Sequence, residues 1–235
     1  IVQSGGSTSV NESGTTDTFT IVLNAQPASN VVLNITSSDT GEATVTSALT
    51  FTSGNWNSAQ TVTVTGVDDN LVDGSQTSTI TVAINDGSSD NNFDPVADQT
   101  VSVTTTDNDV AGFTIAQSGG STSVAETGTT DTFTVVLNAG PTSDVVLSIT
   151  SGDTGEATVT SALTFTSGNW NSAQTVTVTG VDDNLVDGTI TSTITVAVND
   201  GSSDNNFDPV VDQTVSVTTT DNDVAGFTIA QSGGS

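Results

Sequence analysis

Apolar and polar residues alternate one by one along most of this chain, in many short segments. A period of two residues places every second side chain on one face, which predicts β-strands with one buried face. Gly, Pro, Asn and Asp cluster between the segments and predict turns, and no segment shows the period of a helix. The expected strands are residues 18–23, 31–35, 43–45, 49–52, 61–65, 78–84 and 99–103 of the first half, with equivalents in the second.

Seven to nine short strands in little more than a hundred residues predict an all-β fold built of β-sandwiches. Thr dominates the outward face of the strands, where it favours extended backbone and stays hydrated. We expect Trp56 and Trp170 to cover the core where a strand begins. The side chains expected in the core of the first half are Phe19, Leu23, Leu33, Phe51, Val62, Val64, Ile80 and Val82.

The sequence repeats with a period of 114 residues. Ile1 and the six residues after it return from Ile115 and again from Ile229, with Ala in place of Val2. The first two copies differ at 13 of 114 aligned positions, and each has the length of one autonomous domain. We therefore expect one sandwich in residues 1–110 and a second in 111–224. Residues 225–235 are expected to form the first strand of a third repeat, or a strand shared with a neighbour. A recent duplication without a selected geometry is the alternative.

The chain has 27 acidic residues and no Lys, Arg or His, which gives a net charge of −27. Side-chain salt bridges and imidazole catalysis are therefore excluded, and nucleic acid is an unsuitable partner because its affinity comes from Lys and Arg. Cys is absent as well, so disulfides and thiolate metal sites are excluded. Carboxylates that converge in the fold must bind protons or cations, and oxygen ligands suit Ca²⁺ above all. Solubility or adaptation to high salt is the alternative reading of the acidity.

The acidic residues cluster in loops between the predicted strands. Glu12 precedes a strand, residues 68–73 lie between two strands, and residues 107–109 close the repeat. Because strand ends from distant parts of a Greek-key sandwich meet at one pole, these loops are expected to converge there and to bind one or more Ca²⁺ ions. Two further acidic loops, residues 39–42 and 86–94, are interpreted as solvated. The second is long, and the alternative is that it binds an ion of its own or mediates contacts between molecules.

A resemblance to a known family is carried by four segments and covers nearly the whole of both repeats. The segments are Val10-x-Glu12, Leu49-Thr50-Phe51, Thr61-Val62-Thr63-Val64 followed by Asp68-Asp69, and Asp107-Asn108-Asp109. They are similar to the Calx-β domain, and most of all to tandem Calx-β-like repeats of large bacterial secreted and surface proteins. The resemblance implies immunoglobulin-like Greek-key sandwiches that bind Ca²⁺ at one end.

The resemblance also implies which residues are the calcium ligands. They are the early Glu, the paired Asp, an acid a few residues on, and the acids of the closing triplet. In this chain those positions are Glu12, Asp68, Asp69, Asp73, Asp107 and Asp109, and Glu126, Asp182, Asp183, Asp187, Asp221 and Asp223.

The function expected is structural: an extracellular, calcium-stabilised rod or filament, as in a surface fibre, an adhesin stalk or a matrix. The alternative is a calcium-dependent adhesion module that recognises a glycan or a partner surface. An enzyme is not expected, since only a carboxylate-pair hydrolase is conceivable with these residue types. No apolar run approaches the roughly 20 residues of a membrane span, so a secreted or cell-surface location is expected, without membrane insertion.

The expected partners are calcium and the chain itself, as neighbouring repeats or as subunits. Assembly can follow two routes that the sequence does not separate. One is a long, covalently continuous chain of domains. The other is non-covalent stacking, with the segment from Phe227 to Ser235 adding a strand to a neighbour's sheet.

Overall fold

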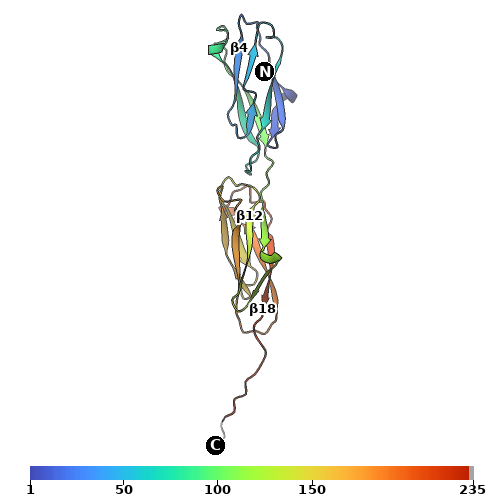
Figure 1. Cartoon of the computed structure of the whole chain (residues 1–235), viewed down its shortest axis with the longest axis vertical. Helices are drawn as coiled ribbons and strands as arrows, with labels where there is room; N and C mark the ends of the chain where they lie inside the picture. The colour runs from blue at the N-terminus through green and yellow to red at the C-terminus, as the bar shows by residue number, and fades with distance from the viewer. Residues whose placement is uncertain (233–235) are drawn as a thin grey trace. The chain divides into compact units, whose positions relative to one another are not determined.

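The computed structural model describes residues 1–232 of the chain. It divides into two compact units, Ile1–Asp109 and Val110–Ser235. Each unit consists of two β-sheets packed face to face (Figure 1). The predicted all-β sandwich fold is confirmed, with nine strands per unit in the described residues.

Unit 1 has a four-stranded sheet in the order β1-β3-β7-β5 and a five-stranded sheet in the order β2-β9-β8-β4-β6. Every strand pair is antiparallel except β2 and β9, which run parallel. The strands are β1 (Val2–Gln3), β2 (Thr8–Asn11), β3 (Thr16–Ile21), β4 (Val31–Ser37), β5 (Ala43–Val45), β6 (Ala48–Phe51), β7 (Gln60–Gly66), β8 (Gln76–Ile84) and β9 (Gln99–Thr106).

Unit 2 repeats this topology, with sheet orders β10-β12-β16-β14 and β11-β18-β17-β13-β15. Its first and third strands are longer than their counterparts in unit 1. The strands are β10 (Phe113–Gln117), β11 (Thr122–Ala125), β12 (Thr130–Leu137), β13 (Val145–Ser151), β14 (Ala157–Val159), β15 (Ala162–Phe165), β16 (Gln174–Gly180), β17 (Ile190–Val198) and β18 (Gln213–Thr220). Four single-turn 3₁₀ helices, Ser4–Gly6, Asp86–Ser88, Ser118–Gly120 and Asp200–Ser202, complete the described elements.

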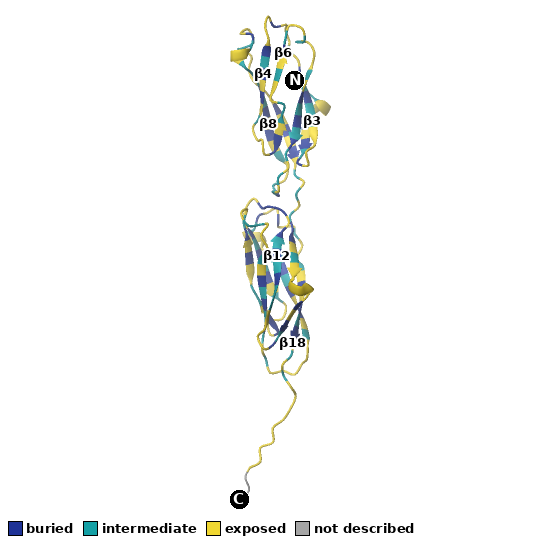
Figure 2. Ribbon diagram, in the orientation of Figure 1, coloured by how far each residue is buried: buried dark blue, intermediate teal, exposed yellow. Residues whose placement is uncertain are grey.

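The core of unit 1 lies between its two sheets, where the inward side chains are buried (Figure 2). Of the eight core residues predicted in unit 1, all except Leu23 are buried, and Leu23 is only partly buried against the cluster. Trp56 is half-buried in the turn between β6 and β7, where its carbonyl oxygen accepts a hydrogen bond from the N–H of Leu23 at 3.1 Å.

Residues 225–235 were expected to form the first strand of a third repeat, or a strand shared with a neighbour. Residues 225–232, expected to begin a strand, form none, and residues 233–235 lie outside the described residues. A strand needs a partner: the same sequence forms β10 in unit 2 by pairing with β12, and the 235 residues contain no third copy of β12. Within the described residues, no helix is long and apolar enough to cross a membrane.

Candidate metal centre

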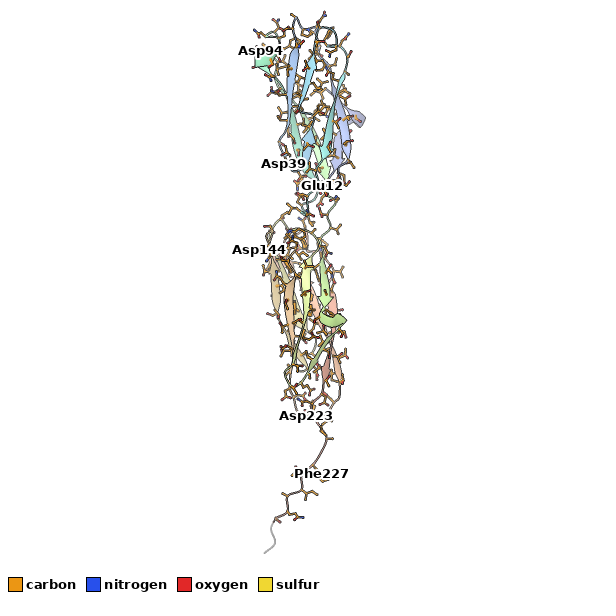
Figure 3. The ribbon with its side chains drawn as sticks, in the orientation of Figure 1. Glu12, Asp39, Asp94, Asp144, Asp223 and Phe227 are labelled. Atoms are coloured by element: carbon orange, nitrogen blue, oxygen red, sulfur yellow. The ribbon has the colours of Figure 1, made fainter. Side chains whose placement is uncertain are left out.

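The acidic loops of unit 1 converge because of how its strands pair. β2 and β9 run parallel with Asn11 opposite Thr106, so both strands end at the same pole. Glu12, which follows β2, and the 107–109 loop, which follows β9, therefore lie side by side. The N–H of Glu12 donates to the carbonyl oxygen of Thr106 at 3.1 Å. Figure 3 shows Glu12 and Asp39 at one end of unit 1 and Asp94 at the other.

The other sheet brings two further acidic segments to the same pole. β5 begins at Ala43 opposite Gly66, the last residue of β7. Glu42, just before β5, therefore lies beside the 68–73 loop that follows β7. The N–H of Val67 donates to the carbonyl oxygen of Glu42 at 2.9 Å, which holds the two segments together.

Gly66 allows the two sheets to approach each other closely at this pole. A Cβ atom at Gly66 would lie 2.1 Å from the carbonyl oxygen of Asn11, and at Gly180 the same distance from that of Ala125. Because no side chain fits in that gap, Gly is the residue that lets the end of β7 contact the end of β2. This contact places Glu12 against the 68–73 loop.

The carboxylates of each pole form triads whose oxygens lie within 4.8 Å of one another. In unit 1 Glu12 belongs to two triads. Glu126 is shared in the same way in unit 2, where a third triad contains Glu156. The triads are Glu12 with Asp69 and Asp109; Glu12 with Glu42 and Asp73; Glu126 with Asp183 and Asp223; Glu126 with Asp187 and Asp221; and Glu156 with Asp183 and Asp187.

Backbone hydrogen bonds fix the carboxylates that the triads share or adjoin. The N–H of Asn108 donates to Oε2 of Glu12 at 3.2 Å, and the equivalent bond joins Asn222 to Glu126 at the same distance. Asp107 accepts hydrogen bonds from the N–H groups of Gly74 at 2.8 Å and Asp109 at 2.6 Å. The acidic loops are therefore ordered by backbone donors, since the chain has no basic side chain to order them.

Several carboxylate oxygens of the two clusters are buried and have no hydrogen-bond partner among residues 1–232. The four glutamates of the chain, Glu12, Glu42, Glu126 and Glu156, are between 1% and 8% exposed. A buried carboxylate without a partner is unfavourable unless it is protonated or bound to a cation. The unpartnered oxygens are Glu42 Oε2, Asp73 Oδ1, Asp109 Oδ2, Glu126 Oε1, Glu156 Oε2 and Asp223 Oδ2.

The pKa values of several of these carboxyl groups are raised, as expected where negative charges crowd together away from water. Burial raises the pKa of Glu12 to about 7, against the opposite effect of the hydrogen bond from Asn108. The nearby charges of Asp107, Asp69 and Glu42 add to the rise. Burial likewise raises the pKa of Glu42, Asp73 and Asp109, with neighbouring carboxylates contributing to each.

Unit 2 shows the same direction of change. For Glu126 the largest effect is the hydrogen bond from Asn222, which lowers its pKa. Burial and the charges of Asp221 and Asp183 outweigh that bond, so the pKa is raised. Burial, followed by neighbouring charge, raises the pKa of Glu156 and Asp223. The acidic clusters of both units therefore contain carboxyl groups whose pKa values are raised.

The structure sorts the predicted ligands into two groups. Glu12, Asp69, Asp73 and Asp109 lie in the triads of unit 1, whereas Asp107 instead accepts backbone N–H groups. Asp68 is exposed and accepts a hydrogen bond from the Asn108 amide at 2.9 Å, as Asp182 does from Asn222 at 2.7 Å. In unit 2 the triads contain Glu126, Asp183, Asp187, Asp221 and Asp223.

Glu42 and Glu156 belong to the clusters but were not among the predicted ligands, and the interpretation of residues 39–42 as a solvated loop is wrong for Glu42. Asp39 does remain exposed, closing a turn by accepting the N–H of Gly41 at 2.9 Å. The available signal was residue type: the chain uses Glu only four times, and all four lie in the clusters.

The second loop interpreted as solvated, residues 86–94, also contains a buried acid. Asp90 is 5% exposed and accepts hydrogen bonds from the N–H groups of Ala28 at 2.6 Å and Asn92 at 3.0 Å. It joins two loops at the pole opposite the acidic cluster, so its role is structural.

Comparison with known proteins gives structural likenesses only. No family model matches the chain, and no curated protein matches it by sequence. Among solved structures, domains 4 and 5 of the S-layer protein SbsC are 23% identical, with a TM-score of 0.38, covering 80% of this chain and 70% of that one. SbsC domains 1–6 are 23% identical to this chain, with a TM-score of 0.39, and the match covers 81% of this chain and 20% of that one. CBD12 from CALX1.2 is 10% identical to this chain, with a TM-score of 0.34, and the match covers 92% of this chain and 98% of that one. TM-scores this low carry no conclusion about function.

Proposed function

We propose that each unit is a calcium-binding, immunoglobulin-like module of the Calx-β type, and that tandem units form an extracellular structural rod or filament. The observation that carries the calcium assignment is the pair of triads that share the buried carboxylate of Glu12. Glu12 would hold a cation together with the acids of either triad, and the same arrangement recurs at Glu126.

The donor set favours Ca²⁺ over other ions. Every side chain in the triads offers carboxylate oxygen, and the chain contains no Cys or His to attract softer metals. Ca²⁺ accepts six to eight oxygens in flexible geometry, whereas Mg²⁺ requires a near-octahedral set and retains its water. The ligands proposed are those of the triads, together with Asp68, Asp107 and Asp182 at their margins.

A structural role is supported by the repetition itself. Two units that differ at 13 of 114 positions present the same surfaces at a regular interval. The acids that the triads use are identical in both copies, whereas Asn11 and Ser13, on either side of Glu12, are Ala125 and Thr127 in the second. Repetition of one metal centre in successive units suits a rod whose stability depends on external calcium.

The test is the thermal unfolding of the 235-residue chain in Ca²⁺, in EGTA and in Mg²⁺. Calcium at about 100 times its dissociation constant stabilises a site by about 2.7 kcal/mol, which is about 10 °C for a domain of this size. We expect a calcium-specific rise of at least that size, because each unit has more than one triad.

Two double variants sharpen this test. Glu12→Gln with Glu126→Gln removes the shared carboxylates and should abolish most of the rise. Asp98→Asn with Asp212→Asn removes the same charge from exposed residues and should leave the rise intact. Equal unfolding temperatures in Ca²⁺ and EGTA, or equal effects of the two double variants, would refute the calcium assignment.

A further inference from the structure

A tryptophan is held at the surface of each unit, in the turn between β6 and β7 and in the equivalent turn between β15 and β16. Trp56 and Trp170 are both half-buried. β7 begins at Gln60 and ends at Gly66, which lies at the acidic pole. The turn before Gln60 therefore lies at the opposite pole of the unit, away from the acidic cluster.

Hydrogen bonds within the turn make it rigid. Oδ1 of Asn55 accepts the N–H of Thr52 at 2.5 Å and its hydroxyl at 3.1 Å. The N–H of Trp56 donates to the carbonyl oxygen of Thr52 at 3.0 Å, and the carbonyl oxygen of Trp56 accepts the N–H of Leu23 at 3.1 Å. A turn fixed in this way loses little conformational freedom when it binds a ligand, which favours affinity.

The turn of unit 2 has the same bonds. Oδ1 of Asn169 accepts the N–H of Thr166 at 2.6 Å and its hydroxyl at 3.3 Å. The carbonyl oxygen of Trp170 accepts the N–H of Leu137 at 3.1 Å. Leu137 is only 3% exposed, so Trp170 remains half-buried even where the core beside it is closed. The partial exposure of the tryptophan is therefore a property of the turn itself.

Several polar groups of the turn are free to bind a ligand. Within residues 1–232, neither the indole N–H of Trp56 nor the side chain of Asn57 has a hydrogen-bond partner. Asn57 is exposed, and Asn55 uses only its Oδ1 atom, which leaves its Nδ2 group free. An indole N–H normally has a partner where a Trp side chain is buried. A ligand at this turn would complete the hydrogen bonds that the chain leaves open.

The turn carries no charge in a strongly acidic chain. Residues 43–67 contain no acidic side chain, although the chain has 27 acids and no Lys, Arg or His. Residues 157–181 have the same sequence. The net charge of −27 repels acidic ligands, and a basic partner would be attracted to the acidic loops instead. The chemistry of the turn therefore suits an uncharged ligand.

We propose that this turn is a binding site for a neutral polysaccharide, with Trp56 as its centre in unit 1 and Trp170 in unit 2. The indole ring offers a flat apolar surface to the C–H groups of a sugar ring and a polar N–H at its edge. The Asn57 amide both donates and accepts hydrogen bonds, as sugar hydroxyls do. An apolar surface with a few placed polar groups is the usual composition of a small-ligand site.

The repetition of the turn fits a ligand that is itself a repeat. A polysaccharide offers many equivalent sugar residues, and two copies of the turn in one chain can raise the apparent affinity for one polymer. This inference goes beyond the proposed structural role and does not rest on the calcium assignment, because the turn and the acidic cluster lie at opposite poles of the unit.

Tryptophan fluorescence reports on the proposed site directly, because Trp56 and Trp170 are the only tryptophans and the chain has no Tyr. The 235-residue chain is titrated in Ca²⁺ with a glucan, a mannan, a galactan and a soluble chitin oligosaccharide, and with polygalacturonate as the acidic comparison. We expect at least one neutral polymer to shift the emission and to protect the tryptophans from quenching by acrylamide. Polygalacturonate should do neither.

The first variant removes the aromatic surface. Trp56→Leu with Trp170→Leu keeps an apolar side chain at both positions and should weaken binding about 30-fold or more, as expected for the anchor of an interface. Affinity electrophoresis in gels that contain the bound polymer measures this without tryptophan fluorescence. Circular dichroism in Ca²⁺ should be unchanged.

The second variant leaves the half-buried rings in place, so it does not depend on the fold tolerating their loss. Asn57→Ala with Asn171→Ala removes exposed amides and should weaken binding about tenfold. Asn70→Ala with Asn184→Ala is the matched control, since these asparagines are exposed at the acidic pole, and binding should be unchanged.

The proposal is overturned if no neutral polymer changes the fluorescence, if polygalacturonate binds as well as the neutral polymers, or if the two asparagine variants behave alike. A fluorescence change when the chain alone is concentrated would assign the turn to a contact between copies and would also overturn it. Polysaccharide binding by a chain that shows no calcium-dependent rise in unfolding temperature would refute the proposed calcium role and leave this inference standing.

Discussion

The backbone N–H of Asn108 donates a hydrogen bond to Oε2 of Glu12, 96 residues earlier in the chain, at 3.2 Å. This bond joins the first acidic residue of unit 1 to its closing acidic triplet. It holds the Glu12 carboxylate, which belongs to two triads of acidic side chains. Each unit therefore carries at one pole a cluster of acidic side chains drawn from segments far apart in the sequence.

The first prediction concerns the ligand that sequence reasoning missed. Glu42→Gln combined with Glu156→Gln should remove more than half of the calcium-induced rise in unfolding temperature, because each residue contributes a buried oxygen to a triad. Calorimetry in Ca²⁺ and EGTA measures the rise. Asp39→Asn with Asp153→Asn is the control in the same two loops, since both acids are exposed and an amide oxygen also accepts the turn hydrogen bond. A full rise in the Glu variant would exclude Glu42 and Glu156 as ligands.

The second prediction is a reversal of the pH dependence by calcium. A carboxyl group whose pKa is higher in the folded state binds more protons when folded, so stability increases as pH falls. For Glu12 the window runs from about 7 down to its ordinary value of 4.5. In EGTA the chain should therefore be more stable at pH 5 than at pH 8.

In saturating Ca²⁺ the order should be opposite, because protons compete with the cation for the same oxygens. Urea unfolding at pH 5, 6, 7 and 8 in both conditions checks this. Stability that falls on acidification in EGTA would contradict the raised pKa values. Measurements go no lower than pH 5 because Asp17, Asp90 and Asp204 have lowered pKa values, and their contribution is lost only in stronger acid.

The third prediction tests the close contact of the sheets at the acidic pole. Gly66→Ala should destabilise unit 1 by about 2–3 kcal/mol, since its Cβ would lie 2.1 Å from the carbonyl oxygen of Asn11 and the backbones would have to separate. It should also weaken calcium binding, because Glu12 follows Asn11. Urea unfolding and calcium titration measure the two effects. Gly54→Ala, whose Cβ makes only an ordinary 3.8 Å contact, should change neither by a comparable amount.

The fourth prediction concerns the buried acid at the opposite pole of unit 2. Asp204 accepts hydrogen bonds from Thr142 N–H and O–H, both at 2.7 Å, and from Ser143 N–H at 2.9 Å. Burial acts to raise its pKa, but these bonds outweigh it and lower the pKa. Asp204→Ala should cost about 1–3 kcal/mol because buried donors lose their acceptor.

This loss should be the same in Ca²⁺ and in EGTA, which separates a structural acid from a metal ligand. Urea unfolding in both conditions measures it. Asp208→Ala, at an exposed position in the same loop, is the control and should have little effect. A loss that appears only in Ca²⁺ would mean that Asp204 belongs to a metal site.

The local pattern of the sequence predicted most of the strands. Alternation identified β3 to β9 within a few residues, and residues 43–45 matched β5 without error. β2 was not predicted, although Thr8 and Val10 alternate as its buried residues. β2 has four residues, which is too short a segment for periodicity to separate a strand from a loop.

The sequence by itself determined the all-β fold, the 114-residue repeat and the excess of carboxylates over basic groups. Backbone geometry makes side chains alternate along any strand, and a chain with no basic residues cannot neutralise its own carboxylates. Only the tertiary structure decided that Glu42 joins Glu12 and that Asp68 stays exposed. Each of these depends on which strand ends meet and what fills the space between the sheets. Both follow from pairings between residues far apart in sequence, which no local pattern records.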